Sequence, residues 1–308
     1  MPVTPSSPPS GELVALDWGS TSLRAYLLGE AGTILDRRAE PWGILQLSAG
    51  AFRAAFDRIT AGWSSVTGPL PAIASGMIGS AQGWVEAPYV DLPAGAAQLA
   101  KQLVPVSGVA LRIVPGLAQR GASPDVMRGE ETQIVGALAT RPDLDDGLII
   151  LPGTHSKWVR LAEGRVREFS TYMTGELFAV LRAHSILGRL APAEPRDPAI
   201  VGAAFARGVS AAQRSAGGLG PILFSTRASV LVGALAGESS LEYLSGLLIG
   251  DELRAGLARS GRPAALIGDP TLCARYVAAL EQFGIEGMPV LADSAPAGLW
   301  AIAQHASS

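Results

Sequence analysis

The sequence has few of the residues that form disulfides or metal centres. It holds a single cysteine, Cys273, which excludes an intrachain disulfide and a cysteine-rich metal site. Its three histidines, His155, His184 and His305, are scattered, so the spacing of a zinc site is missing as well. We therefore interpret Cys273 as a small buried hydrophobic residue.

Long apolar runs and basic clusters are missing too. No stretch of 18 apolar residues could span a membrane, and residues 1–11 carry no apolar core of a signal peptide, so we expect a cytoplasmic protein with a disordered tail at 1–11. The net charge is −3 and no basic cluster occurs, which argues against nucleic acid or a membrane as partner. The phosphate-binding patterns G-x-x-x-x-G-K-[ST] and G-x-G-x-x-G after a strand are absent, which disfavours those two nucleotide folds.

What the sequence does contain is a strand–turn–strand pattern that occurs twice. The chain has 308 residues, of which 48% are apolar, so it can form two domains with substantial cores. The apolar run Leu13–Leu16 leads through a polar turn into the alternating segment Leu23–Leu28. Leu148–Leu151 and Trp158–Leu161 repeat this order around a second turn. The repeat predicts two similar lobes.

The first turn has the composition of a phosphate and magnesium site. It carries one carboxylate, one glycine and three hydroxyls, in Asp17, Gly19, Ser20, Thr21 and Ser22. Glycine lets backbone N–H groups approach an anion closely, and hydroxyls add further donors. An aspartate beside them can hold Mg²⁺ directly or through water. The alternative is an ordinary polar hairpin turn in which Asp17 is a turn residue.

The second turn repeats this chemistry with Gly153, Thr154 and His155. Two such turns facing each other could hold a polyphosphate, and a role of His155 in the site is left open. Gly268 lies between a predicted strand and a helix that Asp269 would cap. A glycine before a helix N-terminus suits a ribose, an adenine edge or a phosphate.

A glycine-rich loop follows the predicted strand Pro71–Ser75. Its members Gly76, Met77, Ser80 and Trp84 are candidates for substrate binding, because loops at strand ends carry function more often than the strands do. The alternative is a long connector in which Met77 and Trp84 fill the core.

Charged residues in the middle of the chain are candidates for acid–base chemistry and for binding an anionic substrate. Arg128 could hold a substrate carboxylate in a bidentate manner, and Lys157 is the second candidate. Glu130, in the first turn of a predicted helix, could take a proton from a hydroxyl. Glu131, which points about 100° away on that helix, is one rival. Glu176 is the other, in the first turn of a later helix that Thr174 is expected to cap.

Strings along nearly the whole chain resemble the 2-dehydro-3-deoxygalactonokinase family, within the acetate and sugar kinase/Hsc70/actin superfamily. They are LDWGSTSLRA, SGMIGSAQGW with VEAPY, VMRGEETQIVGA, LPGTHSKWV, MTGELFAVL, EYLSGLLIG and TLCARY. VMRGEETQ and LPGTHSKW at their mutual spacing are the specific ones. Gly268-Asp269-Pro270 departs from the glycine–hydroxyl turn associated with the nucleotide motif.

The resemblance implies an α/β fold of two RNase-H-like domains of the actin and sugar-kinase type, with ATP in an interdomain cleft. We expect the first domain at 12–120, the second at 121–293, and a C-terminal helix at 294–308 that packs back on the first. Asp17 with Gly19–Ser22 matches the first phosphate motif and the Mg²⁺-linked aspartate, and Gly153-Thr154 matches the second phosphate motif. Gly129-Glu130 matches the position of the catalytic base.

The implied reaction is ATP-dependent phosphorylation of 2-dehydro-3-deoxy-D-galactonate at its 6-hydroxyl, in galactonate catabolism. Three alternatives remain: a kinase of another sugar or sugar acid, a non-catalytic nucleotide-dependent sensor, and a phosphoanhydride hydrolase on the same scaffold. The sequence leaves the oligomeric state open, with a homodimer as one option.

Overall fold

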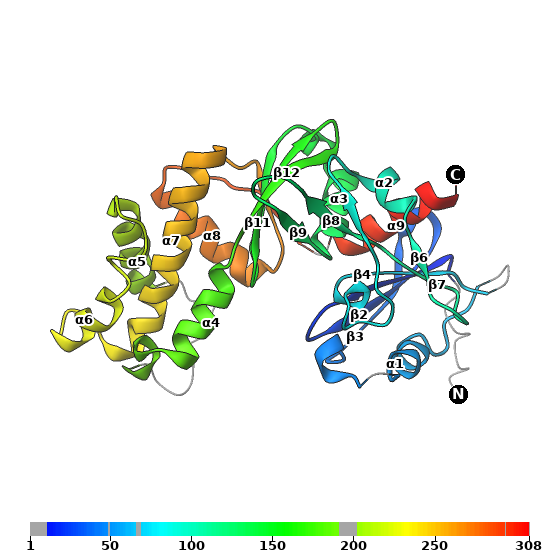
Figure 1. The fold of residues 1–308 in the computed structure, drawn as a ribbon, viewed down its shortest axis with the longest axis horizontal. Helices are drawn as coiled ribbons and strands as arrows, with labels where there is room; N and C mark the ends of the chain where they lie inside the picture. Colours follow the sequence, from blue (N-terminus) through cyan, green and yellow to red (C-terminus); the bar gives the residue numbers. More distant parts are fainter. Residues whose placement is uncertain (1–10, 49, 66–68, 191–201, 293, 308) are drawn as a thin grey trace, which may run out of the picture. The chain divides into compact units, whose positions relative to one another are not determined.

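The computed structural model describes residues 11–48, 50–65, 69–190, 202–292 and 294–307. The tail predicted at 1–11 lies outside this part of the chain except for Gly11. The chain forms two compact units: unit 1 comprises Met1–Asp145, Ala162–Glu168 and Asp293–Ser308, and unit 2 comprises Asp146–Leu161 and Phe169–Ala292. Figure 1 shows the helices and strands of both units.

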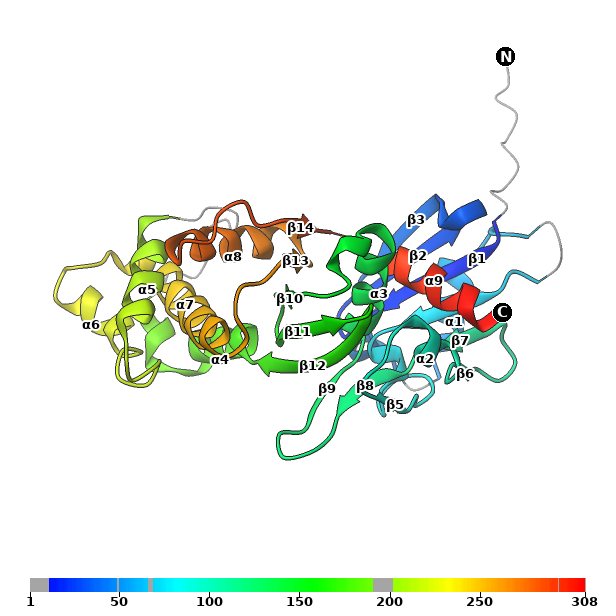
Figure 2. The same cartoon turned by 90° about the horizontal axis from the view of Figure 1, so that it is seen from above.

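Unit 1 is built on a mixed sheet of six strands in the order β3-β2-β1-β4-β7-β6 (Figure 2). The strands are β1 (Leu13–Trp18), β2 (Leu23–Leu28), β3 (Ile34–Glu40), β4 (Ala72–Ser75), β6 (Val104–Pro105) and β7 (Leu111–Ile113). β1, β2 and β3 pair antiparallel, whereas β4 lies parallel to β1, and β7 parallel to β4. This order and these directions are those of an RNase-H-like sheet.

The helices of unit 1 pack either on this sheet or on a helix that contacts it. They are α1 (Phe52–Ile59), α2 (Ala96–Ala100), α3 (Glu130–Thr140) and α9 (Ala295–Ser307), with 3₁₀ turns at Glu30–Gly32, Ile44–Gln46, Met77–Gly79 and Pro142–Leu144. Phe52, Ala55 and Ile59 recur at helical spacing and are buried in one core with β1 and β2. α9, red in Figure 2, contacts β1, β4 and α3. The C-terminal helix thus belongs to unit 1.

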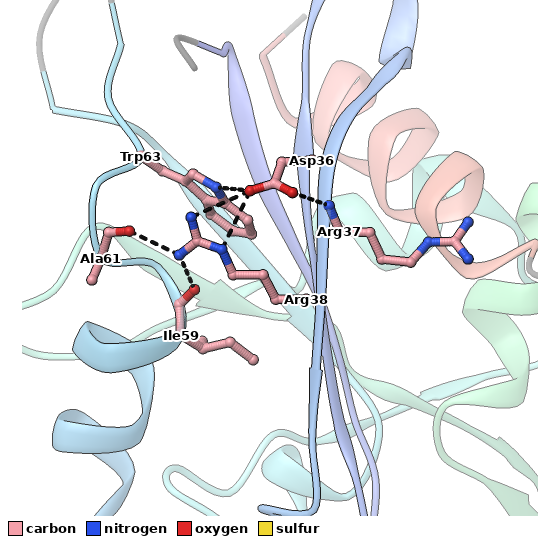
Figure 3. Close-up of polar contacts among 6 residues, drawn as sticks. All are labelled: Asp36, Arg37, Arg38, Ile59, Ala61 and Trp63. Carbon is pink, nitrogen blue, oxygen red and sulfur yellow. Dashed lines mark hydrogen bonds and ion pairs between the residues drawn. The ribbon is translucent and has the colours of Figure 1, made fainter. Parts of the chain in front are cut away.

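A polar cluster fixes the end of α1 to β3 (Figure 3). The Trp63 indole N–H donates to Asp36 Oδ2 at 2.8 Å, and the Arg38 guanidinium stacks over the Trp63 ring at 4.2 Å. Arg38 also donates to the carbonyl oxygens of Ile59 and Ala61, at 2.7 and 2.8 Å. The hydrogen bond from Trp63 is the main cause that lowers the pKa of Asp36. The cluster satisfies carbonyl groups at the C-terminal end of the helix.

A second, three-stranded sheet in unit 1 has no counterpart among the predicted elements. Its order is β5-β8-β9, with β5 at Tyr89–Asp91, β8 at Gly116–Gln119 and β9 at Asp125–Met127. Strands this short show no clear alternation of polar and apolar residues. The sequence placed the domain boundary at 120/121, whereas residues 121–145 belong to unit 1, because β9 pairs with β8 and α3 packs on α9. The boundary is therefore later than predicted.

Unit 2 repeats the sheet order of unit 1 with β12-β11-β10-β13-β14. The strands are β10 (Leu148–Leu151), β11 (Ser156–Ala162), β12 (Arg165–Tyr172), β13 (Ala265–Ile267) and β14 (Val290–Leu291). β10 pairs antiparallel with β11, β13 lies parallel to β10, and β14 parallel to β13. The predicted internal repeat is therefore present in the topology.

The helices of unit 2 are α4 (Thr174–His184), α5 (Ala203–Arg214), α6 (Ser225–Leu231), α7 (Ser240–Ser260) and α8 (Pro270–Gln282), with 3₁₀ turns at Ile186–Leu190 and Gly237–Ser239. α5 and α7 pack closely (Figure 1), since a Cβ at Gly246 would overlap the backbone of Phe205. This contact explains the mid-helix glycine. Asp269 caps α8 as expected, because its Oδ1 accepts from the Leu272 N–H at 3.0 Å.

Candidate functional site

The first predicted phosphate turn is a tight loop between β1 and β2. The Gly19 N–H donates to the Ser22 carbonyl at 2.9 Å, which closes the turn. The N–H groups of Ile44 and Leu45 donate to the carbonyls of Gly19 and Ser20, at 3.0 and 3.1 Å. A neighbouring segment therefore holds the turn, and this support was not predicted because it comes from more than 20 positions along the chain.

Asp17 lies at the C-terminal end of β1, next to Ser75 in the parallel register with β4. Its side chain is 20% exposed and forms an ion pair with Arg24 Nη1 at 3.2 Å. One partly exposed carboxylate beside a hydroxyl-rich turn fits Mg²⁺, which commonly binds one or two carboxylates together with substrate phosphates and water.

Close contacts of two glycines bring the start of α3 to the edge of unit 1 where β1 and β4 end. Gly76 follows β4 with φ +95°, and a Cβ on it would come within 2.8 Å of the Trp18 carbonyl oxygen. Gly129 has φ +109°, and its Cβ would lie 3.3 Å from Gly76 Cα. A left-handed backbone and the lack of space both favour glycine at these two positions. They place Glu130 near the end of the strand that carries Asp17.

The two adjacent glutamates of α3 have different surroundings. Glu130 is partly exposed, and its Oε2 accepts from the Arg128 backbone N–H at 3.0 Å. Glu131 is 1% exposed, and its Oε2 accepts from the Gly129 N–H at 2.7 Å. Burial, together with the negative charge of Glu130, raises the pKa of Glu131 to about 8. Of this pair, only Glu130 has a carboxylate that a substrate could reach.

The Arg128 side chain lies inside the glycine-rich loop. Its Nη2 donates to the Ala87 carbonyl at 2.8 Å, and its guanidinium stacks on the Tyr89 ring at 4.4 Å. Its Nε and Nη1 are buried and have no hydrogen-bond partner among the described residues. Since buried donors are rarely left unsatisfied, this guanidinium is suited to an anionic oxygen ligand.

The rest of this loop divides into polar and packing residues. The hydroxyl oxygens of Ser75 and Ser80 are buried and, within the described part of the chain, have no hydrogen-bond partner. Met77 and Trp84 instead pack against the unit 1 core, where Trp84 stacks on Phe52 with ring centroids 6.3 Å apart. The contacts of Met77 and Trp84 favour the core-filling alternative, whereas Ser80 keeps the character of a binding residue.

The second predicted phosphate turn connects β10 to β11 in unit 2. The Gly153 N–H donates to Ser156 Oγ at 3.3 Å. The start of α4 packs directly on the turn, since a Cβ at Gly175 would lie 2.6 Å from the Gly153 carbonyl oxygen. The Glu176 N–H donates to the Thr154 carbonyl at 3.0 Å. The turn and the N-terminus of α4 therefore meet at one corner of unit 2, in an arrangement that suits an anion.

The side chains of His155 and Lys157, which follow this turn, already have partners in unit 2. His155 Nε2 contacts Glu176 Oε2, and both side chains are largely exposed. Lys157 is 4% exposed and donates to Thr171 Oγ1 at 2.7 Å. Lys157 already has a hydrogen-bond acceptor in Thr171, whereas two nitrogens of Arg128 have none among the described residues, so Arg128 is the better candidate for the substrate carboxylate.

A cavity of about 670 Å³ opens at this corner of unit 2. It is lined by Gly153, Thr154, Thr174, Gly175, Phe178, Arg182, Glu238, Leu241, Glu242, Ser245, Leu248, Ile249, Asp269, Thr271, Leu272, Arg275 and Tyr276. The phosphate turn and the first residues of α4 and α8 provide polar groups, and the aliphatic and aromatic side chains provide apolar walls. This combination is typical of a small-molecule site.

Two features of the cavity differ from the sequence prediction. Asp269 and Thr271 line it, whereas the predicted residue Gly268 is adjacent to them and donates its N–H to the Leu291 carbonyl at 3.0 Å. Arg275, which is 7% exposed, forms a two-pronged ion pair with Glu242 at 2.9 and 2.6 Å. This pair is not predicted from the sequence, because its members are 33 positions apart and no local motif joins them.

Thr174 was expected to cap α4, and this expectation is wrong. Met173 is the residue before the helix, and the Thr174 hydroxyl instead donates to the buried carboxylate of Glu252. Because Thr174 is the first residue of the helix and not the residue before it, its hydroxyl is not placed to accept an N–H of the first turn and donates to a long-range partner instead.

The two RNase-H-like sheets, each with a glycine- and hydroxyl-bearing turn after its first strand, define a protein of the acetate and sugar kinase/Hsc70/actin class. The model of the 2-keto-3-deoxy-galactonokinase family matches residues 17–302. The chain belongs to this family.

Known proteins agree with this assignment. A protein of Rhizobium meliloti (strain 1021) named "Probable 2-dehydro-3-deoxygalactonokinase DgoK1" is 42% identical over 303 residues, which cover 96% of this chain and 97% of the relative. The 2-dehydro-3-deoxygalactonokinase of Escherichia coli (strain K12) is 35% identical, with 94% and 97% covered. A crystal structure of a family member from Sinorhizobium meliloti matches with a TM-score of 0.83 at 39% identity, over 95% of this chain and 98% of that one.

The predicted family, the α/β fold and the expectation of a carbohydrate kinase are thereby confirmed. No helix among the described residues is long and apolar enough to cross a membrane. The individual site residues, the interdomain cleft, the cytoplasmic location and the oligomeric state stay predictions.

Proposed function

We propose that the chain transfers the γ-phosphoryl group of ATP to the 6-hydroxyl of 2-dehydro-3-deoxy-D-galactonate, in galactonate catabolism. The observation that carries this proposal is the arrangement at one edge of unit 1. There the glycine contacts of Gly76 and Gly129 set Glu130, an accessible carboxylate, near the strand end that carries Asp17. A base and a metal-binding carboxylate at neighbouring positions are what phosphoryl transfer to an alcohol requires.

In this proposal Glu130 accepts the proton of the 6-hydroxyl as its oxygen forms the bond to the γ-phosphorus. The bond between that phosphorus and the bridging oxygen of ATP breaks, and ADP leaves with the electron pair. Asp17 would hold Mg²⁺, which neutralises phosphate charge when bound. The hydroxyl groups of Ser20, Thr21 and Ser22 would donate hydrogen bonds to phosphate oxygens.

The nucleotide would bind in the cavity of unit 2. The Gly153–Thr154 turn, the N-terminus of α4 and Thr271 of α8 line this cavity and would face phosphate or ribose oxygens. Phe178 and Leu241 are among the apolar walls, which suit an adenine ring. Support for this placement comes from the volume and from the polarity of the lining, and the predicted residues Gly153 and Thr154 are part of it.

The carboxylate of the sugar acid would bind near Arg128. The unsatisfied Nε and Nη1 of Arg128 and the hydroxyl groups of Ser75, at the end of β4, and Ser80, in the glycine-rich loop, are candidate donors. They offer a compact set of hydrogen-bond donors that a charged, hydroxylated substrate can satisfy.

A substrate screen tests the proposal directly. The purified chain is assayed with Mg²⁺–ATP and a panel of ketodeoxy sugar acids and aldoses, and ADP formation is coupled to NADH oxidation. We expect the fastest turnover with 2-dehydro-3-deoxy-D-galactonate, with phosphate found on its 6-oxygen by NMR. Faster turnover of another sugar would favour the first alternative, a kinase with a different substrate.

The other two alternatives give distinct results in the same assay. A hydrolase would release ADP at the same rate with and without a sugar acid. A sensor would bind the nucleotide without turnover, but the accessible Glu130 at the start of α3 favours a catalyst over a sensor.

A further inference from the structure

Glu252 is a buried carboxylate in the middle of α7 that the proposed reaction does not use. Its side chain is 3% exposed. Three donors from three other elements converge on it: the Trp158 indole N–H at 2.9 Å, the Tyr276 hydroxyl at 2.6 Å and the Thr174 hydroxyl. These donors belong to β11, α8 and α4. One carboxylate thus joins four elements of unit 2.

Burial raises the pKa of Glu252, and the hydrogen bonds that its carboxylate accepts oppose that effect. The geometry favours an ionised carboxylate that accepts all three hydrogen bonds, because an ionised carboxylate can only accept and each of the three partners can donate. Two of those partners, Thr174 and Tyr276, also line the cavity of about 670 Å³. The carboxylate therefore lies directly behind the wall of the predicted nucleotide site.

A hydrogen-bond relay connects Glu252 to the phosphate turn. Tyr276 donates its hydroxyl proton to Glu252, which leaves the Tyr276 oxygen as an acceptor for the Ser156 hydroxyl at 2.8 Å. Ser156 Oγ in turn accepts the Gly153 N–H at 3.3 Å. Because Glu252 cannot donate when ionised, it sets the direction of every hydrogen bond in this relay.

We propose that Glu252 is a positioning residue for the nucleotide phosphates, which acts on the Gly153 turn through Tyr276 and Ser156. The inference rests on the proposed function, in which this turn binds the phosphates of ATP. It explains why a carboxylate is placed among the buried residues Ile249, Leu253 and Gly256 of α7, where an apolar side chain would pack without needing a partner. The relay requires an acceptor at this position.

Three variants separate positioning from mere stability. Tyr276→Phe keeps the ring and removes the hydroxyl that links Glu252 to Ser156. Glu252→Gln keeps the shape of the side chain. Because the Trp158 N–H can only donate, the amide oxygen must accept from it, and the NH₂ group then faces Tyr276. The direction of the hydrogen bonds in the relay is thereby reversed. Trp158→Phe is the matched control, because it removes one hydrogen bond to the same carboxylate that is not part of the relay.

The measurement compares ADP with adenosine by calorimetry, well below the melting temperature of each variant. We expect Tyr276→Phe and Glu252→Gln to weaken ADP binding about tenfold, the effect of one hydrogen bond, with adenosine binding changed by less than about twofold. Trp158→Phe should lower the melting temperature and leave both affinities unchanged. The KM for ATP should rise in the two relay variants while the KM for the sugar acid stays constant.

The inference is overturned if Tyr276→Phe binds ADP as tightly as the unmodified chain, if ADP and adenosine weaken alike, or if Trp158→Phe shows the same loss. If Glu252→Gln does not fold, the ADP affinity of Tyr276→Phe is sufficient to test the inference. An unmodified chain that binds no ADP contradicts the proposed function itself. If the unmodified chain phosphorylates the sugar acid and the two relay variants bind ADP with unchanged affinity, only the role of Glu252 is contradicted.

Discussion

Gly129 packs against Gly76, so that a Cβ at Gly129 would lie 3.3 Å from Gly76 Cα. Both residues have positive φ, and each introduces a functional segment: Gly76 the glycine-rich loop and Gly129 the helix of Glu130. The contact sets the distance between the end of β4 and the first turn of α3. Four predictions follow from the groups around this edge of unit 1.

The first prediction concerns the base. Glu130→Gln keeps an oxygen that can accept from the Arg128 N–H but cannot take a proton, so kcat should fall about 10²-fold or more while ATP still binds. Steady-state kinetics and calorimetry measure the two effects. Glu131→Gln and Glu176→Gln serve as controls, and a normal rate in Glu130→Gln with a large loss in Glu176→Gln would assign the base to unit 2.

The second prediction concerns the metal. Asp17→Asn removes the only acid of the first turn, so most turnover should be lost and higher Mg²⁺ should restore only part of it, while the chain stays folded. Arg24→Gln is the matched control, because it breaks the ion pair with Asp17 and leaves the carboxylate in place. Equal activity losses in the two variants would mean that the ion pair, rather than metal binding, is what matters.

The third prediction concerns the sugar acid. Arg128→Ala should raise the KM for the sugar acid at least about tenfold, the effect of losing a charge-assisted hydrogen bond, and should change the KM for ATP little. Arg128→Lys keeps the charge but not the planar fork, and it should recover only part of the affinity.

A substrate analogue that lacks the carboxylate provides the control for Arg128. The unmodified chain should prefer the acid strongly, whereas Arg128→Ala should hardly distinguish the two compounds. If the variant keeps the preference and loses activity on both, Arg128 supports the loop through its hydrogen bond to Ala87 and the carboxylate binds elsewhere.

The fourth prediction concerns stability and pH. Because the folded pKa of Glu131 is about 8 and the ordinary value is 4.5, the folded chain binds the extra proton between these two values. The free energy of unfolding should therefore fall as pH rises from about 4.5 to 8, with a contribution of at most about 1.4 kcal/mol per pH unit.

Glu131→Gln removes this titration and keeps an acceptor for the Gly129 N–H. Denaturant unfolding at a series of pH values should show the variant gaining stability relative to the unmodified chain toward pH 8. Parallel pH profiles for the two proteins would show that folding does not raise the pKa of Glu131 above its ordinary value.

The sequence by itself determined the elements whose signals are local. The apolar run Leu148–Leu151 and the alternating segment Leu23–Leu28 are strands in the structure, and Asp269 with Pro270 starts α8 as predicted. These elements depend on side-chain periodicity and on capping between residues close in sequence. The repeated turns and the family resemblance rest on equally short strings, which is why the fold class could be predicted.

Only the tertiary structure decided which polar groups are buried and which hydrogen-bond partners they have. Glu130 and Glu131 are adjacent in sequence, yet one is accessible and the other is 1% exposed. Trp158 and Glu252 are 94 positions apart, and the Thr174 hydroxyl is drawn to that same carboxylate from the helix end it was expected to cap. The burial of a polar side chain and its long-range partners depend on how the helices pack on the sheets, and local sequence periodicity does not predict that packing.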